Sequence, residues 1–195
     1  RIRQDLPRIE AALEGLTGYV EQVISDRQAH PRDDLVTTLL LAHEDDDALT
    51  RRELSVSLVF LAFAGMETTR NQLGLALQTL LARPDQWALL AERPELGGRA
   101  VEEVMRVNPT VTWVTREAVE DVDIDGLHVP KGGIVQVLSH AAGTDPLVMG
   151  PAAGIDITVE DRPLHSGFGG GVHHCLGHFV ARTDMSVALP LLAQR

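Results

Sequence analysis

The sequence predicts a mainly α-helical fold with small β-sheets. Apolar residues recur every three to four positions over residues 5–29, which is the spacing of an amphipathic helix, and capping residues and prolines delimit further helices up to residue 107. Between residues 111 and 138, short β-branched runs surround an Asp125-Gly126 pair, a combination typical of a β-hairpin. The chain has 195 residues, 44% of them hydrophobic, which is enough for a hydrophobic core. We expect residues 1–195 to form a single domain.

The longest predicted element is a helix that begins near Thr50. Thr50 and Glu53 have the spacing of a capping box, in which each residue satisfies a backbone donor of the other. No proline follows before Pro84, so we expect a helix of about thirty residues, roughly 45 Å long. Other helices are predicted at 5–29 with an interruption near Gly15 to Gly18, and at Leu35–Ala42, Asp85–Ala91 and Leu96–Val107.

Four short strands are predicted after the helices, and a coil follows them. The coil covers residues 142–167, where several glycines and prolines occur and periodicity is weak. A last helix is predicted from His178 to Leu189. The strands are expected at Val111–Val114, Val122–Ile124, Leu127–Val129 and Ile134–Leu138.

Charge and composition exclude several classes of partner. The formal net charge of −11 argues against nucleic-acid binding, because phosphates require a basic surface. The longest apolar stretch, Leu54 to Met66, is too short to cross a bilayer, so we expect no membrane partner. A single cysteine excludes an internal disulfide and fits a reducing compartment, so a cytoplasmic location is expected.

That cysteine, Cys175, lies in a glycine-rich loop before the last predicted helix. Glycines remove Cβ atoms and allow a flat partner to approach the backbone closely. A helix N-terminus stabilises a thiolate, which is the form of cysteine that binds metals. A lone cysteine can also be a small buried hydrophobic residue. With His173, His174 or His178 it could form a zinc site, although one cysteine and adjacent histidines do not have the usual spacing.

The spacing F-G-x-G-x-H-x-C-x-G over residues 168–177 resembles the haem-ligand loop of the cytochrome P-450 family of haem-thiolate monooxygenases. The resemblance implies that Cys175 is the axial thiolate ligand of haem b and that His173 contacts a haem propionate. The other positions of the motif that the resemblance assigns to cofactor binding are Phe168, Gly171 and Gly177.

Three further segments resemble the same family in the same chain order. Residues 64–68 match its A-G-x-E-T segment. There Gly65 would leave room for dioxygen, Thr68 would hydrogen-bond the oxygen species, and Glu67 would relay protons from solvent. Arg116 matches an arginine that binds a haem propionate. Glu103 and Arg106 match the buried E-x-x-R pair, although by spacing alone they could equally be a surface ion pair.

The resemblance implies the C-terminal half of the cytochrome P-450 fold, because family members are roughly twice this length. Two positions depart from the pattern. Gly143-Thr144 stands where N-R is common, and Gly154 stands where a basic residue usually completes the Glu103–Arg106 cluster. Arg162 is offset by several residues, so we expect the cluster to lack its third partner and the coil over 142–167 to be loose.

The function implied is insertion of one atom of O2 into a small apolar organic substrate. Electrons would come from a separate ferredoxin- or flavodoxin-type donor. Two alternatives remain open at this point. The chain could be a catalytically silent fragment that binds no haem, or a module that binds a metal through Cys175 and histidines.

Overall fold

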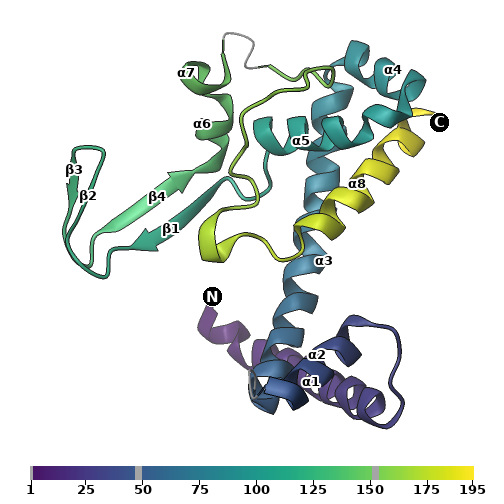
Figure 1. Cartoon of the computed structure of the whole chain (residues 1–195), viewed down its shortest axis with the longest axis vertical. Coiled ribbons are helices and arrows are strands. Elements are labelled where there is room, and N and C mark those ends of the chain that lie inside the picture. The colour runs from purple at the N-terminus through teal and green to yellow at the C-terminus, as the bar shows by residue number, and fades with distance from the viewer. Residues whose placement is uncertain (1, 47–49, 151–153) are drawn as a thin grey trace. The chain divides into compact units, whose positions relative to one another are not determined.

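The computed structural model describes residues 2–46, 50–150 and 154–195 (Figure 1). The chain forms two compact units, Arg1–Met66 and Glu67–Arg195, and the boundary between them falls inside the longest helix. Helices dominate, and the strands of the described residues form two antiparallel two-stranded sheets. The predicted fold class is therefore confirmed.

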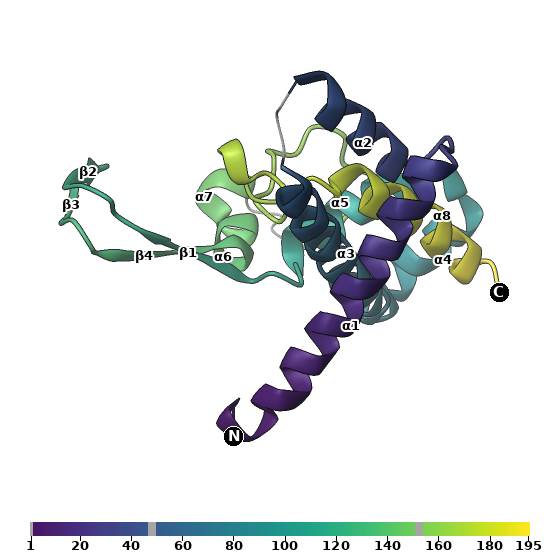
Figure 2. The ribbon, with the colours of Figure 1, turned by 90° about the horizontal axis from the view of Figure 1, so that it is seen from below.

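The first unit consists of α1 (Ile2–Ala29), α2 (Leu35–Asp46) and the beginning of α3 (Arg51–Leu81). The predicted interruption of the first helix is wrong, since α1 runs unbroken past Gly15 and Gly18 (Figure 2). A glycine costs a helix only about 1 kcal/mol, and the apolar stripe continues on both sides of this segment. The core of this unit contains Val20, Ile24, Leu40 and Leu54.

Helix α3 is 31 residues long, in agreement with the predicted length, and it has the predicted cap. The Thr50 N–H donates to the Glu53 carboxylate at 2.7 Å, and the Glu53 N–H donates to the Thr50 hydroxyl at 3.2 Å. This reciprocal pairing satisfies two backbone donors at the helix start. Pro84 ends the run as expected, because α4 (Pro84–Glu92) begins there.

The helices of the second unit enclose a larger core. Helices α5 (Gly97–Val107) and α8 (His178–Ala193) pack side by side, and α4 packs against α8 (Figures 1 and 2). A 3-10 turn, η1 (Pro94–Leu96), joins α4 to α5. The second half of α3 contributes Ala76 and Leu80 to the same core, which also contains Leu90, Val104, Met185 and Leu189. This core packs α5 against α8, the helix that directly follows the cysteine loop.

The strands form a ribbon that extends away from α5 and α8 (Figures 1 and 2). Strand β1 (Trp113–Glu117) pairs with β4 (Ile134–Leu138), and β2 (Val122–Ile124) pairs with β3 (Leu127–Val129). Asp125 and Gly126 connect β2 to β3 with φ angles of 48° and 83°, as the hairpin motif requires. Two short helices follow β4, namely α6 (Ser139–Thr144) and α7 (Pro146–Met149).

Candidate functional site

The cysteine loop lies directly before α8, as the sequence predicts. Gly169 and Gly171 have φ angles of 71° and 62°, which favour glycine. The Cys175 N–H donates to the Phe168 carbonyl at 2.9 Å and closes the loop. The His178 N–H, at the first residue of α8, donates to the Cys175 carbonyl at 3.3 Å. The sulfur atom is thus carried at a helix N-terminus, where a thiolate is favoured.

The surface of this loop is open. Cys175 is exposed, so the alternative in which it is a buried hydrophobic residue is wrong. A Cβ atom built at Gly170, Gly171 or Gly177 would meet no atom within 4 Å. Two apolar side chains lie beside these glycines, Val172 at 97% exposure and Leu176 at 79%. An accessible sulfur donor with bare backbone and apolar side chains around it suits a flat, apolar, thiolate-ligated group such as haem.

A charged cluster anchors the base of the loop to α5 and α8. Arg182 on α8 donates to both carboxylate oxygens of Glu102 on α5, at 2.6 and 3.1 Å. Its guanidinium lies 4.3 Å from the centre of the Phe168 ring, within the range of a cation–π contact. It also lies 2.7 Å from Nδ1 of His178. Arg182 therefore connects both helices to the aromatic residue that begins the cysteine loop.

His165 completes this cluster from the coil. Its Nδ1 accepts the Gly167 N–H at 3.0 Å, so Nε2 of the neutral ring carries the proton and donates to Glu102 at 3.1 Å. Burial alone would raise the pKa of Glu102, but hydrogen bonds from His165 and Arg182 outweigh it and lower the pKa to about 2. The pKa of His178 is lowered, first by desolvation and then by the neighbouring His174 and Arg182.

Glu103 and Arg106 form a buried ion pair on α5, so the surface-pair alternative is wrong. Arg106 is 1% exposed and donates to the two Glu103 oxygens at 2.9 and 2.8 Å. Its remaining donors reach the carbonyl of Gly143 at 2.7 Å and that of Gly154 at 2.9 Å. Arg106 thus binds backbone carbonyls that come before and after residues 151–153 in the sequence.

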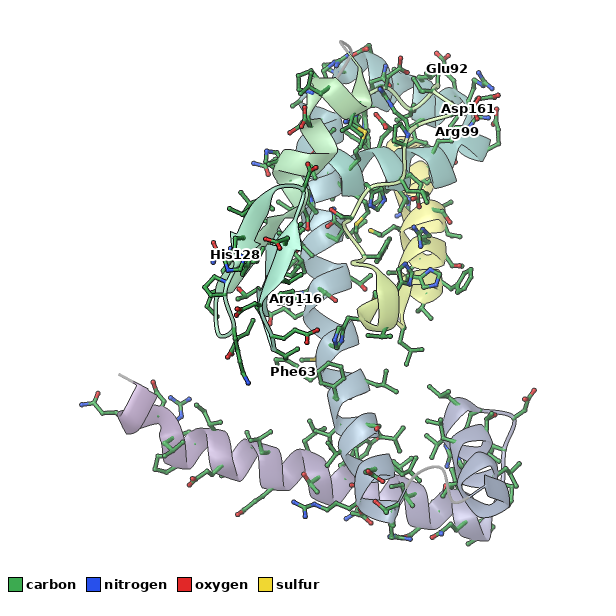
Figure 3. The ribbon with its side chains drawn as sticks, turned by 60° about the vertical axis from the view of Figure 1, so that its left-hand side comes forward. Phe63, Glu92, Arg99, Arg116, His128 and Asp161 are labelled. Atoms are coloured by element: carbon green, nitrogen blue, oxygen red, sulfur yellow. The ribbon has the colours of Figure 1, made fainter. Side chains whose placement is uncertain are left out.

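The remaining predicted residues lie on α3 and on β1. Glu67 and Thr68 are exposed on the part of α3 that belongs to the second unit, and Gly65 lies in the part of that helix assigned to the first unit. Glu67 approaches Arg70 at 3.6 Å. Arg116 is exposed on strand β1 and is labelled in Figure 3. The Arg116 guanidinium donates to the Thr115 carbonyl at 2.9 Å.

The part of the chain that the structure describes offers neither a metal-binding cluster nor a membrane-spanning helix. No group of three or more histidine, cysteine or acidic side chains is arranged there to hold a metal ion. This finding gives no support to the alternative of a metal-binding module built on Cys175 and histidines. None of the helices there has the length and apolar character that a membrane span requires.

Comparison with known proteins identifies the family. A family model for cytochrome P-450 matches residues 2–149. Luteothin monooxygenase from Streptomyces thioluteus is 38% identical over 191 residues, which are 97% of this chain and 47% of that protein. The chain belongs to the cytochrome P-450 family.

Other comparisons place this P-450 chain among bacterial members of the family. Nocardicin C N-oxygenase from Nocardia uniformis subsp. tsuyamanensis is 38% identical over 195 residues, covering 99% of this chain and 48% of that protein. The crystal structure of CalO2 has a TM-score of 0.90 at 36% identity and covers 98% of this chain and 48% of that chain. The chain therefore spans about half the length of the relatives it matches, and its fold is a partial P-450 fold.

One expectation about this P-450 chain is wrong. The Glu103–Arg106 pair does have a third partner, because Arg162 donates from Nε to Glu103 Oε1 at 3.1 Å. The Asp156 N–H adds a hydrogen bond to Oε2 of Glu103 at 3.0 Å. Burial would raise the pKa of Glu103, but the Arg106 and Asp156 hydrogen bonds lower it. The coil predicted to be loose over 142–167 is therefore fastened to α5 at Gly154, Asp156 and Arg162, and its beginning is helical in α6 and α7.

Sequence reasoning also missed Glu102, His165 and Arg182. The signal that could have found them is positional. Glu102 precedes the E-x-x-R motif directly, and Arg182 lies in the first turns of the helix that follows Cys175. Neither position shows by itself that the two side chains meet, because they are 80 residues apart.

Proposed function

We propose that this chain is the haem-binding half of a haem-thiolate monooxygenase. In this proposal Cys175 supplies the axial thiolate to haem b. The observation that supports it most is the exposed thiol at the start of α8, in a loop of glycines open to solvent. Membership of the cytochrome P-450 family and 38% identity to a protein named as a monooxygenase support the interpretation of this loop as a haem-ligand loop.

The proposed cofactor contacts come from the loop and from β1. Phe168, Gly171 and Gly177 shape the loop, and His173 contacts one haem carboxylate. Arg116 binds a carboxylate through its guanidinium, which offers two parallel donors for this purpose. Its exposure on β1 leaves that guanidinium accessible to a ligand.

The proposed proton path lies on α3. Gly65 lacks a side chain and leaves room for dioxygen. The hydroxyl of Thr68 holds a proton, and the carboxyl of Glu67 exchanges protons with solvent, for which its exposure is suited. Glu67 and Thr68 are consecutive residues of α3 and point about 100° apart, so the proposal gives them separate parts of the path and no direct contact.

Haem, when bound, would supply the iron chemistry that places one oxygen atom of O2 in an organic substrate and reduces the other to water. We propose a small apolar substrate and a separate ferredoxin- or flavodoxin-type electron donor. The chain would act in the cytoplasm as one part of a larger domain, together with the half that the relatives possess beyond the matched region.

The test is to load the chain with hemin, reduce it and add carbon monoxide. We expect the red-shifted Soret band of thiolate ligation, and we expect Cys175→Ser to abolish it. Val172→Ser changes the same loop without removing the sulfur and is the matched control, which should keep the position of the band. A wild-type chain without any Soret band would support the silent-fragment alternative and overturn the proposal.

A further inference from the structure

Gln72 is a buried amide that binds backbone on both of its polar atoms. It is 2% exposed and lies on α3, one helical turn after Thr68. Its Nε2 donates to the Asn108 carbonyl at 3.0 Å, and its Oε1 accepts the Thr110 N–H at 2.7 Å. The Gln72 amide therefore pairs with the backbone before and after Pro109, as a neighbouring β-strand would.

A second contact holds the same segment to the same helix. Asn108 donates from Nδ2 to the Thr79 hydroxyl at 3.0 Å. Thr79 follows Gln72 by two turns of α3 and so lies on the same face. Pro109, between the two bonded residues, is fully buried. Residues 108–110 are thus fastened to α3 at two levels.

These residues connect α5 to strand β1. Thr110 precedes Trp113, the first residue of β1, by three positions and Arg116 by six. We propose that Gln72 is a positioning residue, which sets where β1 and Arg116 lie relative to the Thr68 turn of α3. This inference rests on the proposed function, in which Arg116 and Thr68 both serve the same haem group.

Simple packing does not require an amide at this position. Methionine has a similar length, and a volume-conserving apolar replacement in a core is usually tolerated. Loss of the amide would, however, take this partner from the Asn108 carbonyl and the Thr110 N–H, which belong to half-buried residues on either side of the buried Pro109. Those two groups would then recover hydrogen bonds by moving toward water, and β1 would move with them.

The first experiment measures amide hydrogen exchange in the chain without haem. In Gln72→Met we expect the Thr110 amide to exchange about tenfold faster or more, because it loses its acceptor. Gln78→Met makes the same chemical change at an exposed position of α3 and should leave Thr110 unchanged. Equal Thr110 rates in wild type and Gln72→Met would overturn the proposal.

The second experiment separates positioning from general stabilisation by a double-mutant cycle. We expect Gln72→Met to weaken hemin binding about tenfold while the reduced carbon monoxide complex keeps its thiolate band. In the Arg116→Ala background we expect Gln72→Met to cause no further loss, since it acts through Arg116. The same fold loss in both backgrounds would show a merely structural role and overturn the proposal.

The two experiments also distinguish this inference from the proposed function. If the wild-type chain binds no hemin, the proposed function fails, and the Thr110 exchange rate alone decides the role of Gln72. If Gln72→Met does not fold, the amide exchange rate of Thr110 in the wild-type chain tests the proposal instead. Slow exchange at Thr110 supports the tether, and exchange at the rate of an unprotected amide overturns it.

Discussion

Glu102 and Glu103 are neighbours on α5, yet they serve two different parts of the molecule. Successive helical residues point about 100° apart, so the two carboxylates face different partners. Glu103 is 4% exposed and binds Arg106 and Arg162, which hold backbone of the coil. Glu102 is 41% exposed and binds Arg182 and His165 at the base of the cysteine loop.

The difference between these clusters is one of solvent access. Both carboxylates have a lowered pKa, and in both burial opposes the hydrogen bonds that lower it. The Glu103 cluster is dry, so removal of a partner leaves an uncompensated charge in the core. The Glu102 cluster is partly solvated, so water can replace a lost partner. We therefore expect the first cluster to control stability and the second to control the conformation of the loop.

The largest effect is expected from Arg106→Met. This change removes the hydrogen bonds to Glu103, Gly143 and Gly154 and leaves Glu103 with less compensation, which should lower the free energy of unfolding by about 3–5 kcal/mol. Urea unfolding followed by circular dichroism measures it. Arg99→Met is the matched control, because the exposed Arg99–Glu160 pair should contribute at most about 1 kcal/mol. Equal losses for both variants would show that burial does not make the Glu103 cluster more important for stability than an exposed ion pair.

A smaller loss is expected from Gly143→Ala. A Cβ atom at residue 143 would lie 2.1 Å from the Arg106 carbonyl oxygen, so the backbone must move away from α5. We expect a cost of about 2–3 kcal/mol by thermal or urea unfolding. Gly98→Ala is the control, since its Cβ meets nothing within 4 Å and alanine favours a helix, so it should stabilise slightly.

Arg162→Met tests the third member of the Glu103 cluster. Arg162 is 15% exposed and shares Glu103 with Arg106, so we expect a loss of about 1–2 kcal/mol in urea. We also expect faster amide exchange at Asp156, whose N–H donates to the same carboxylate. Unchanged exchange at Asp156 would show that Arg162 does not hold the coil.

The smallest effect is a pH dependence carried by Glu102. Its pKa falls from 4.5 to about 2 on folding, so its stabilisation is present above pH 4.5 and is lost as the pH falls toward 2. Because the side chain is partly exposed, we expect at most about 1 kcal/mol. Glu102→Gln should therefore differ from wild type at pH 6 and match it near pH 2. Glu92→Gln makes the same change at an exposed acid on α4, labelled in Figure 3, and is the matched control.

The features that could be predicted from the sequence are local. The capping box of α3, the Asp125-Gly126 hairpin and the cysteine loop each depend on residues within about ten positions, so spacing alone indicates them. The interruption predicted in α1 was wrong for a local reason as well. Glycine is a weak signal inside a helix whose apolar stripe continues.

The sequence by itself determined the family, the position of the candidate thiolate and the mainly helical fold, because contiguous motifs and periodic apolar residues carry that information. Only the tertiary structure showed that Arg162 reaches Glu103, that Arg182 reaches Glu102, and that Gln72 binds the segment before β1. These pairs are separated by 59, 80 and 36 residues. A contact over such a separation depends on how helices pack, and no local pattern of residue types encodes it.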